Sequence, residues 1–134
     1  MKYIVVLGRF LFSFIFITSS INHFKEQTIQ YAASHGVMMP DILVPAAGVL
    51  AMLGGISILL GWKAKLGGWL IVAFLVPITF IMHNFWTLED PQAHQIQMTM
   101  FMKNLSMLGG AFLITYFGAG PLSIDNRTKN APQK

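Results

Sequence analysis

The sequence is short of charge and contains no cysteine. Charged residues occupy 10% of its 134 positions, compared with about 25% in a typical soluble domain. The absence of cysteine excludes a disulfide framework, a thiol relay, a zinc site with cysteine ligands and an iron–sulfur cluster within this chain. Disorder is excluded too, because 54% of the residues are apolar and disordered chains have few apolar residues and many charges. This composition favours a membrane protein over a soluble one.

Four apolar runs are each long enough to cross a bilayer. They are residues 3–21, 42–62, 66–86 and 98–117. Crossing the hydrocarbon layer takes about 20 helical residues, and helices satisfy the backbone hydrogen bonds that lipid cannot. We therefore expect an all-α membrane protein, with a four-transmembrane-helix antiparallel bundle in residues 1–125 and a disordered polar tail in residues 126–134.

Basic residues are distributed unevenly between the two sides of the predicted bundle. One side carries Lys2, Lys63, Lys65, Arg127, Lys129 and Lys134. The other side carries Lys25, Lys103 at the membrane edge, and the acidic residues Glu26, Asp41, Glu89 and Asp90. Cytoplasmic loops are enriched in lysine and arginine, so we expect both termini in the cytoplasm. Basic cytoplasmic loops also account for the pI of about 9.6. The expected partner is therefore the lipid bilayer and not nucleic acid.

The two connections on either side of the second run differ in length. Residues 63–65 allow only a tight turn, so the second and third runs must be antiparallel neighbours. Residues 24–41 are longer, and within them residues 27–34 are compatible with a short helix stopped by Gly36 or with an ordered loop. The helix would have an apolar face suited to the membrane surface, formed by Ile29, Ala32, Ala33 and Val37.

Polar residues of the first run share one helical face. Steps of four, three, four and three positions place five residues in one stripe, namely Arg9, Ser13, Phe16, Ser20 and His23. Phe, Leu, Ile and Val fill the other faces. Because polar groups are costly against acyl chains, we expect the stripe to face protein or water.

Small residues recur every four positions in the second run, at Ala47, Ala51 and Gly55. Small side chains at this spacing let the backbone of a neighbouring helix approach closely. The second run is therefore expected to pack tightly against another helix.

Seven polar residues in or near the runs form the candidate ligand-binding site. They are Arg9, Asn22, His23, His83, Asn84, Lys103 and Asn104. All but Arg9 fall near the non-cytoplasmic ends of their helices, which predicts one shared polar pocket. Arg9 lies deeper and has no acidic residue in any predicted helix as a partner. Ionisable residues in a membrane predict function by default, but a structural role for Arg9 and snorkelling of His23 and Lys103 remain alternatives.

No catalytic arrangement is evident in the sequence. It contains no nucleophile elbow, P-loop, paired intramembrane carboxylates or dinucleotide-binding glycines. No catalytic residue is therefore assigned, and whether the chain is an enzyme stays open. His23 and His83 have the chemistry to bind haem, but two histidines on the same side of the membrane are too few to favour it. We predict no metal site.

Short motifs follow one another in a characteristic order up to Asp125. They are Gly8-Arg9, His23-Phe24, Tyr31-Ala-Ala-Ser34-x-Gly36-Val37 with Pro40, Leu53-Gly54-Gly55 with Leu60-Gly61, His83-Asn84-Phe85-Trp86, Phe101-x-Lys103-Asn104-Leu105-x-x-Leu108-Gly109-Gly110 and Gly118-x-Gly120-Pro121-x-Ser123-x-Asp125. In order and spacing, this series resembles the DoxX family of small bacterial membrane proteins. Met39 departs from the resemblance, because the family is commonly richer in proline there.

The resemblance implies a multi-pass protein of the bacterial inner membrane. It further implies an accessory or cofactor-binding subunit of a quinone-linked redox system, in which the polar pocket holds a quinone-like cofactor and other redox subunits supply electrons. Two alternatives belong to different classes: a non-catalytic assembly or scaffold subunit, and a protein that binds a small lipid or metabolite. A homo-oligomer is compatible with each of them.

Overall fold

The computed structural model describes residues 1–129, and every regular element in that range is a helix. The four long helices are α1 (Lys2–Asn22), α3 (Pro40–Leu60), α4 (Ala64–Met82) and α5 (Pro91–Phe117). The short ones are α2 (Glu26–Ser34), the 3₁₀ helix η1 (Phe85–Thr87) and α6 (Ile124–Lys129). This confirms the all-α class. By length and apolar composition, three segments are candidate membrane spans: Lys2–Asn22, Pro40–Leu60 and Ala64–Thr87.

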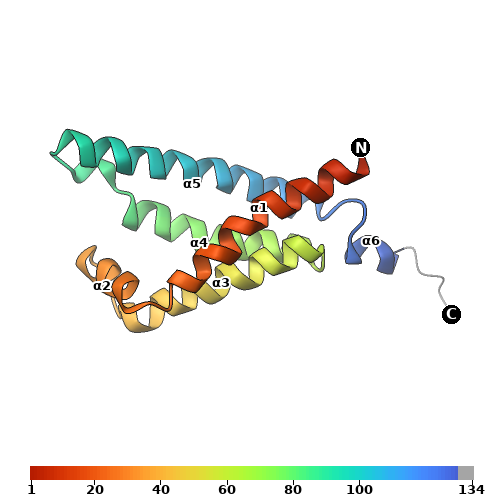
Figure 1. Ribbon diagram of the computed structural model, residues 1–134, viewed down its shortest axis with the longest axis horizontal. Coiled ribbons are helices and arrows are strands. Elements are labelled where there is room, and N and C mark those ends of the chain that lie inside the picture. Colours follow the sequence, from red (N-terminus) through yellow and green to blue (C-terminus); the bar gives the residue numbers. More distant parts are fainter. Residues whose placement is uncertain (130–134) are drawn as a thin grey trace.

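The long helices pack in a series, with α3 between α1 and α4, and α4 against α5. Figure 1 shows the N-terminus and α6 at the same end of the bundle as the α3–α4 turn. The connection through α2 and the α4–α5 connection lie at the opposite end, which we call the α2 end. Apolar side chains fill the core where the four helices meet: Phe16, Ala51, Ile58, Ile71, Val72, Phe74, Leu75 and Ala111.

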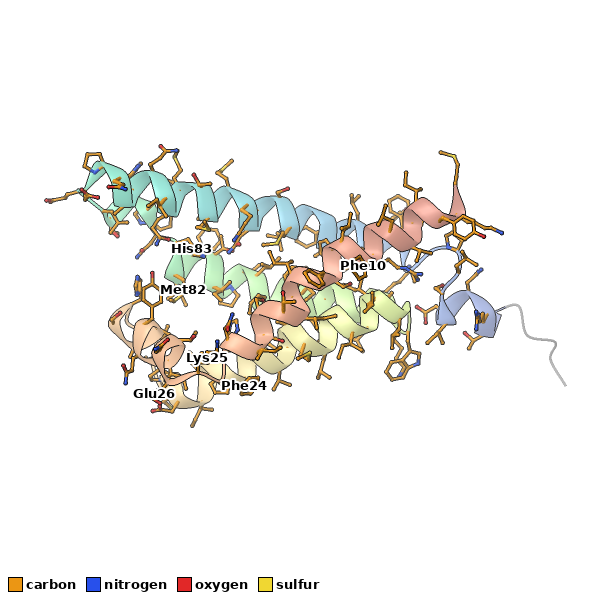
Figure 2. The ribbon with its side chains drawn as sticks, in the orientation of Figure 1. Phe10, Phe24, Lys25, Glu26, Met82 and His83 are labelled. Carbon is orange, nitrogen blue, oxygen red and sulfur yellow. The ribbon has the colours of Figure 1, made fainter. Side chains whose placement is uncertain are left out.

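The buried face of α1 is the stripe predicted from the sequence. Its buried residues are Arg9, Ser13, Phe16 and Ser20, and His23, directly after the helix, is 9% exposed. Large apolar side chains of α1 are exposed, such as Phe10 (Figure 2) at 48% and Leu11 at 62%. Polar residues inside and apolar residues outside are the arrangement expected for a helix in lipid.

The close approach of α3 to α1 depends on two glycines. A Cβ atom on Gly48 would lie 2.6 Å from the Cβ of His23 and 3.1 Å from the carbonyl oxygen of Ser20. A Cβ atom on Gly55 would lie 2.8 Å from Cγ1 of Ile17. Helix α3 therefore packs closely through small residues, as predicted. The contact near His23 is made by Gly48 and not by the neighbouring Ala47.

Helix α5 starts earlier than residue 98, where the apolar run begins. The carboxylate of Asp90 accepts a hydrogen bond of 2.7 Å from the backbone N–H of Ala93, and Pro91 occupies the first turn. Both residue types favour a helix start. The first two turns are polar, so hydropathy alone placed the start too late.

The other predicted boundaries shift by a few residues. Helix α3 begins at Pro40 and ends before Gly61, whose φ of 65° is left-handed. Helix α4 ends at Met82 and not at residue 86, because His83 leaves the helical conformation and η1 follows. Between residues 24 and 41 the helix alternative is confirmed by α2, which ends shortly before Gly36 with its φ of 79°.

We expect replacement of Gly48 by alanine to destabilise the protein by about 1–3 kcal/mol, since the added methyl group meets the His23 Cβ and a backbone oxygen rather than a flexible side-chain tip. The measurement is thermal unfolding in detergent. Gly109→Ala is the matched control, because a Cβ there meets nothing within 4 Å. Equal melting temperatures for both variants would contradict the role of Gly48.

Candidate functional site

The seven candidate residues do not surround one cavity. Arg9 on α1 and His23 directly after α1 are 14 positions apart, which separates them by about 21 Å along the helix axis. Arg9 lies toward the end that holds the N-terminus and α6, whereas His23 lies at the α2 end. Two separate environments therefore have to be described.

Arg9 is a buried cation that contacts the segment following α5. Its side chain is 6% exposed, and Nη2 donates a hydrogen bond of 2.8 Å to the carbonyl oxygen of Leu122. Nη1 lies against Gly61, where a Cβ atom would collide with it. Within residues 1–129, Nε and Nη1 of Arg9 and Oγ of Ser13 are buried without a hydrogen-bond partner. The arrangement fits a structural role in holding the chain end.

The segment between α5 and α6 closes the bundle through Asp125. The Asp125 carboxylate accepts hydrogen bonds from the backbone N–H of Lys63, at 2.7 Å, and of Ala64, at 3.0 Å. Its own N–H donates to the carbonyl oxygen of Gly61, at 2.8 Å. Asp125 thus caps α4 from far along the chain, since Lys63 at the N-cap position has no capping side chain. We call these contacts the C-terminal clasp.

The clasp corrects the predicted start of the disordered tail at residue 126. Helix α6 continues to Lys129, and the hydroxyl of Ser123 accepts a hydrogen bond of 3.2 Å from the N–H of Asn126. A serine side chain at this position favours a helix start. Residues 130–134 lie outside the described residues.

We expect Asp125→Ala to lower the stability by about 1–3 kcal/mol, because it leaves two backbone N–H groups at the start of α4 without their charged acceptor. Chemical unfolding in detergent measures the loss. The control is Asn126→Ala, which shortens an exposed side chain one position away. Identical unfolding curves for Asp125→Ala and Asn126→Ala would contradict a stabilising role of the clasp.

His83, Asn84 and Lys103 lie outside the surroundings of His23. Nδ1 of His83 is 2.7 Å from Oε1 of Gln97, which ties the end of α4 to α5. Asn84 precedes η1 and accepts the N–H of Thr87 through its carbonyl oxygen. Lys103 is exposed, and its Nζ lies 3.4 Å from the sulfur of Met100. The remaining two candidates separate as well: Asn104 is buried, at 5% exposed, and Asn22 is exposed.

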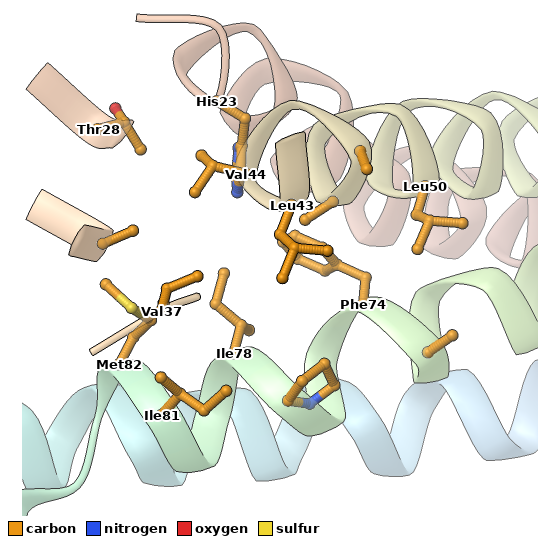
Figure 3. A pocket seen from close by; sticks show the side chains of 15 residues that line it. His23, Thr28, Val37, Leu43, Val44, Leu50, Phe74, Ile78, Ile81 and Met82 are labelled. Carbon is orange, nitrogen blue, oxygen red and sulfur yellow. The ribbon is translucent and has the colours of Figure 1, made fainter. Parts of the chain in front are cut away.

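His23 lines an apolar cavity of about 290 Å³, which we call the α2 pocket. Its walls come from α2, the following loop, α3 and α4, and include Ala32, Val37, Val44, Phe74, Ile78 and Ile81. Of the lining residues, His23 and Thr28 carry the polar groups. Figure 3 shows His23 and Val44 facing Phe74 and Ile78 of α4 across the cavity.

The sequence identified His23 but missed the cavity around it. Polar residues defined the candidate site in the sequence, whereas the pocket walls are aliphatic and aromatic. One signal was present, the apolar face of the predicted short helix. Ala32 and Val37 from that face line the pocket.

Comparisons with known proteins give a consistent family. The SURF4 family model matches residues 1–131. Inner membrane protein YqjF of Escherichia coli is 30% identical over 123 residues, covering 90% of this chain and 88% of that protein. Inner membrane protein YphA of Escherichia coli is 30% identical over 102 residues, covering 76% and 72%. ER-derived vesicles protein ERV29 of Saccharomyces cerevisiae is 31% identical over 81 residues, covering 60% of this chain and 26% of that longer protein. No solved structure matches the chain.

The family match shows that the resemblance to the DoxX family is wrong, and the quinone-linked redox role that it implied is wrong with it. Most of the motifs behind the resemblance consist of glycine pairs, helix-stop glycines and aromatic residues at helix ends. Such residues are frequent in membrane helices generally, so their order and spacing do not distinguish one family of small membrane proteins from another. The inner membrane relatives and the apolar helices establish a multi-pass membrane protein in a lipid bilayer.

Proposed function

Because the chain belongs to the SURF4 family, we propose that it is a membrane receptor that binds an apolar segment of a client polypeptide in the α2 pocket. The observation that carries the proposal is the pocket itself. Its volume of about 290 Å³ is close to the lower bound of about 300 Å³ for ligand sites, which suits a few apolar side chains. The yeast relative is named as a protein of ER-derived vesicles, and that name supports a transport-related role.

The charges at the α2 end support a polypeptide as the ligand. Lys25 directly precedes α2 and Glu26 is its first residue (Figure 2). Asp41 is in the first turn of α3, and Glu89 and Asp90 precede α5. Within the two connections at this end, residues 23–41 and 83–91, four carboxylates against one ammonium group give three net negative formal charges. An acidic end of the bundle favours a client segment with basic groups flanking its apolar anchor.

The proposal includes four membrane spans in one domain of residues 1–125, with both termini in the cytoplasm. Helix α5 has 27 residues and is about 40 Å long, which is enough to cross the hydrocarbon layer. Lys63 and Lys65 lie in or next to the α3–α4 turn, at the same end as the N-terminus and α6. The preference of cytoplasmic loops for basic residues assigns that end to the cytoplasm, and the Escherichia coli relatives support the inner membrane.

Single cysteines test the topology, because the chain has no cysteine of its own. We expect Glu89→Cys to react with a membrane-impermeant maleimide in intact spheroplasts. Lys65→Cys should react only after the membrane is opened. The reverse pattern would place the termini outside the cytoplasm.

Photo-crosslinking tests the pocket. A photoreactive phenylalanine at Ile81, which lines the pocket and is 41% exposed, is compared with one at Val76 on the same helix, which is 39% exposed. We expect adducts with apolar polypeptide segments at residue 81 alone, identified by mass spectrometry. Adding Ala73→Trp, which places a large side chain in the cavity, should abolish these adducts. Lipid adducts alone, or identical adducts at both positions, would overturn the proposal.

A further inference from the structure

One ring nitrogen of His23 is fixed as a hydrogen-bond donor. Nδ1 lies 3.0 Å from the carbonyl oxygen of Ser19. A carbonyl oxygen accepts and never donates, so Nδ1 carries the hydrogen of this bond. In a neutral imidazole the other nitrogen, Nε2, then has no hydrogen and acts as an acceptor.

The packing around His23 keeps this ring in place. Gly48 leaves room for the His23 Cβ, and the ring of Phe74 meets the imidazole edge-on, with centroids 5.5 Å apart at 64°. The backbone bond to Ser19 holds the near side of the ring. Rotation of the imidazole would disturb both contacts, so the direction of Nε2 is set by the fold.

Nε2 belongs to the part of the ring that extends toward the cavity (Figure 3). Within the described part of the chain, the hydrogen bond of the His23 side chain is the one made by Nδ1. Thr28 supplies the other polar side chain of the pocket, whose walls are otherwise apolar. The pocket thus presents an apolar surface with one fixed acceptor.

From this geometry we infer that the α2 pocket selects a segment that carries a hydrogen-bond donor next to its apolar group. Hydroxyl, amide N–H and ammonium groups satisfy Nε2, whereas a carboxylate or an ether meets it with a second acceptor. Nε2 becomes buried when a ligand covers it, and an acceptor that is then left without a donor costs more than a matched bond gains, so ligands with a donor are preferred. The inference rests on the proposed function and defines the chemistry of the client's anchor.

Two isomeric probes, 1-octanol and heptyl methyl ether, separate the donor from the apolar chain. They are titrated against the full chain in phosphatidylcholine nanodiscs, with binding followed by ¹⁵N resonances of labelled histidine. We expect 1-octanol to bind about three to ten times more tightly, the ratio given by one net hydrogen bond. It should also shift the Nε2 resonance of His23, and the ether should not.

Two variants assign the preference to His23. Asparagine at this position keeps an N–H group for the Ser19 carbonyl but has no acceptor at the Nε2 position, so His23→Asn should bind both isomers equally. Thr28→Val removes the other polar group of the pocket and should keep the preference for 1-octanol. Loss of the preference in Thr28→Val alone would assign selection to Thr28 and overturn the inference.

The unchanged protein alone also decides the matter, whether or not His23→Asn folds. A ¹⁵N spectrum with Nε2 protonated and Nδ1 bare, or equal binding of the two isomers, would overturn the inference. If both isomers bind equally and Ala73→Trp abolishes their binding, the inference about the donor is wrong, but the proposal that the α2 pocket binds ligands still holds. If the preference for 1-octanol holds but crosslinking finds no polypeptide, the donor rule stands and the polypeptide client falls.

Discussion

The close contact between α1 and α3 is the constraint on which the rest of the bundle depends. It requires backbone at Gly48 and Gly55 to lie where any side chain would collide with α1. Because lipid tails are as apolar as the helix surfaces, membrane helices associate through such close packing more than through the hydrophobic effect. The contact buries the polar stripe of α1 and leaves its large apolar side chains outside.

The rigidity of α1 separates two polar sites that share one face. Arg9 near the start of the helix serves the C-terminal clasp, where the chain end crosses back over Gly61. His23 after the last turn serves the α2 pocket. A helix with a rise of about 1.5 Å per residue cannot bring them together. A continuous stripe in sequence therefore indicated a buried face and not a single site.

The family assignment changes which part of the structure matters for function. A quinone site would have needed the cationic and imidazole groups of several helices to converge, and His83 and Lys103 instead contact Gln97 and Met100. The α2 pocket needs one histidine and many apolar neighbours. In the proposed function, its position at the same end of the bundle as the acidic residues of the two connections suits a client segment with basic groups.

The sequence by itself determined the helical class, the buried face of α1, the small-residue contact of α3 and the tight α3–α4 turn. These features depend on periodicity and local chain length, which a single segment contains. It did not determine the start of α5, because capping by Asp90 outweighs hydropathy there. The clasp and the α2 pocket were decided only by the tertiary structure, since Asp125 reaches residues more than 60 positions away and the pocket walls come from four separate segments. Contacts between distant segments depend on how the helices are placed relative to one another, and no local pattern encodes that placement.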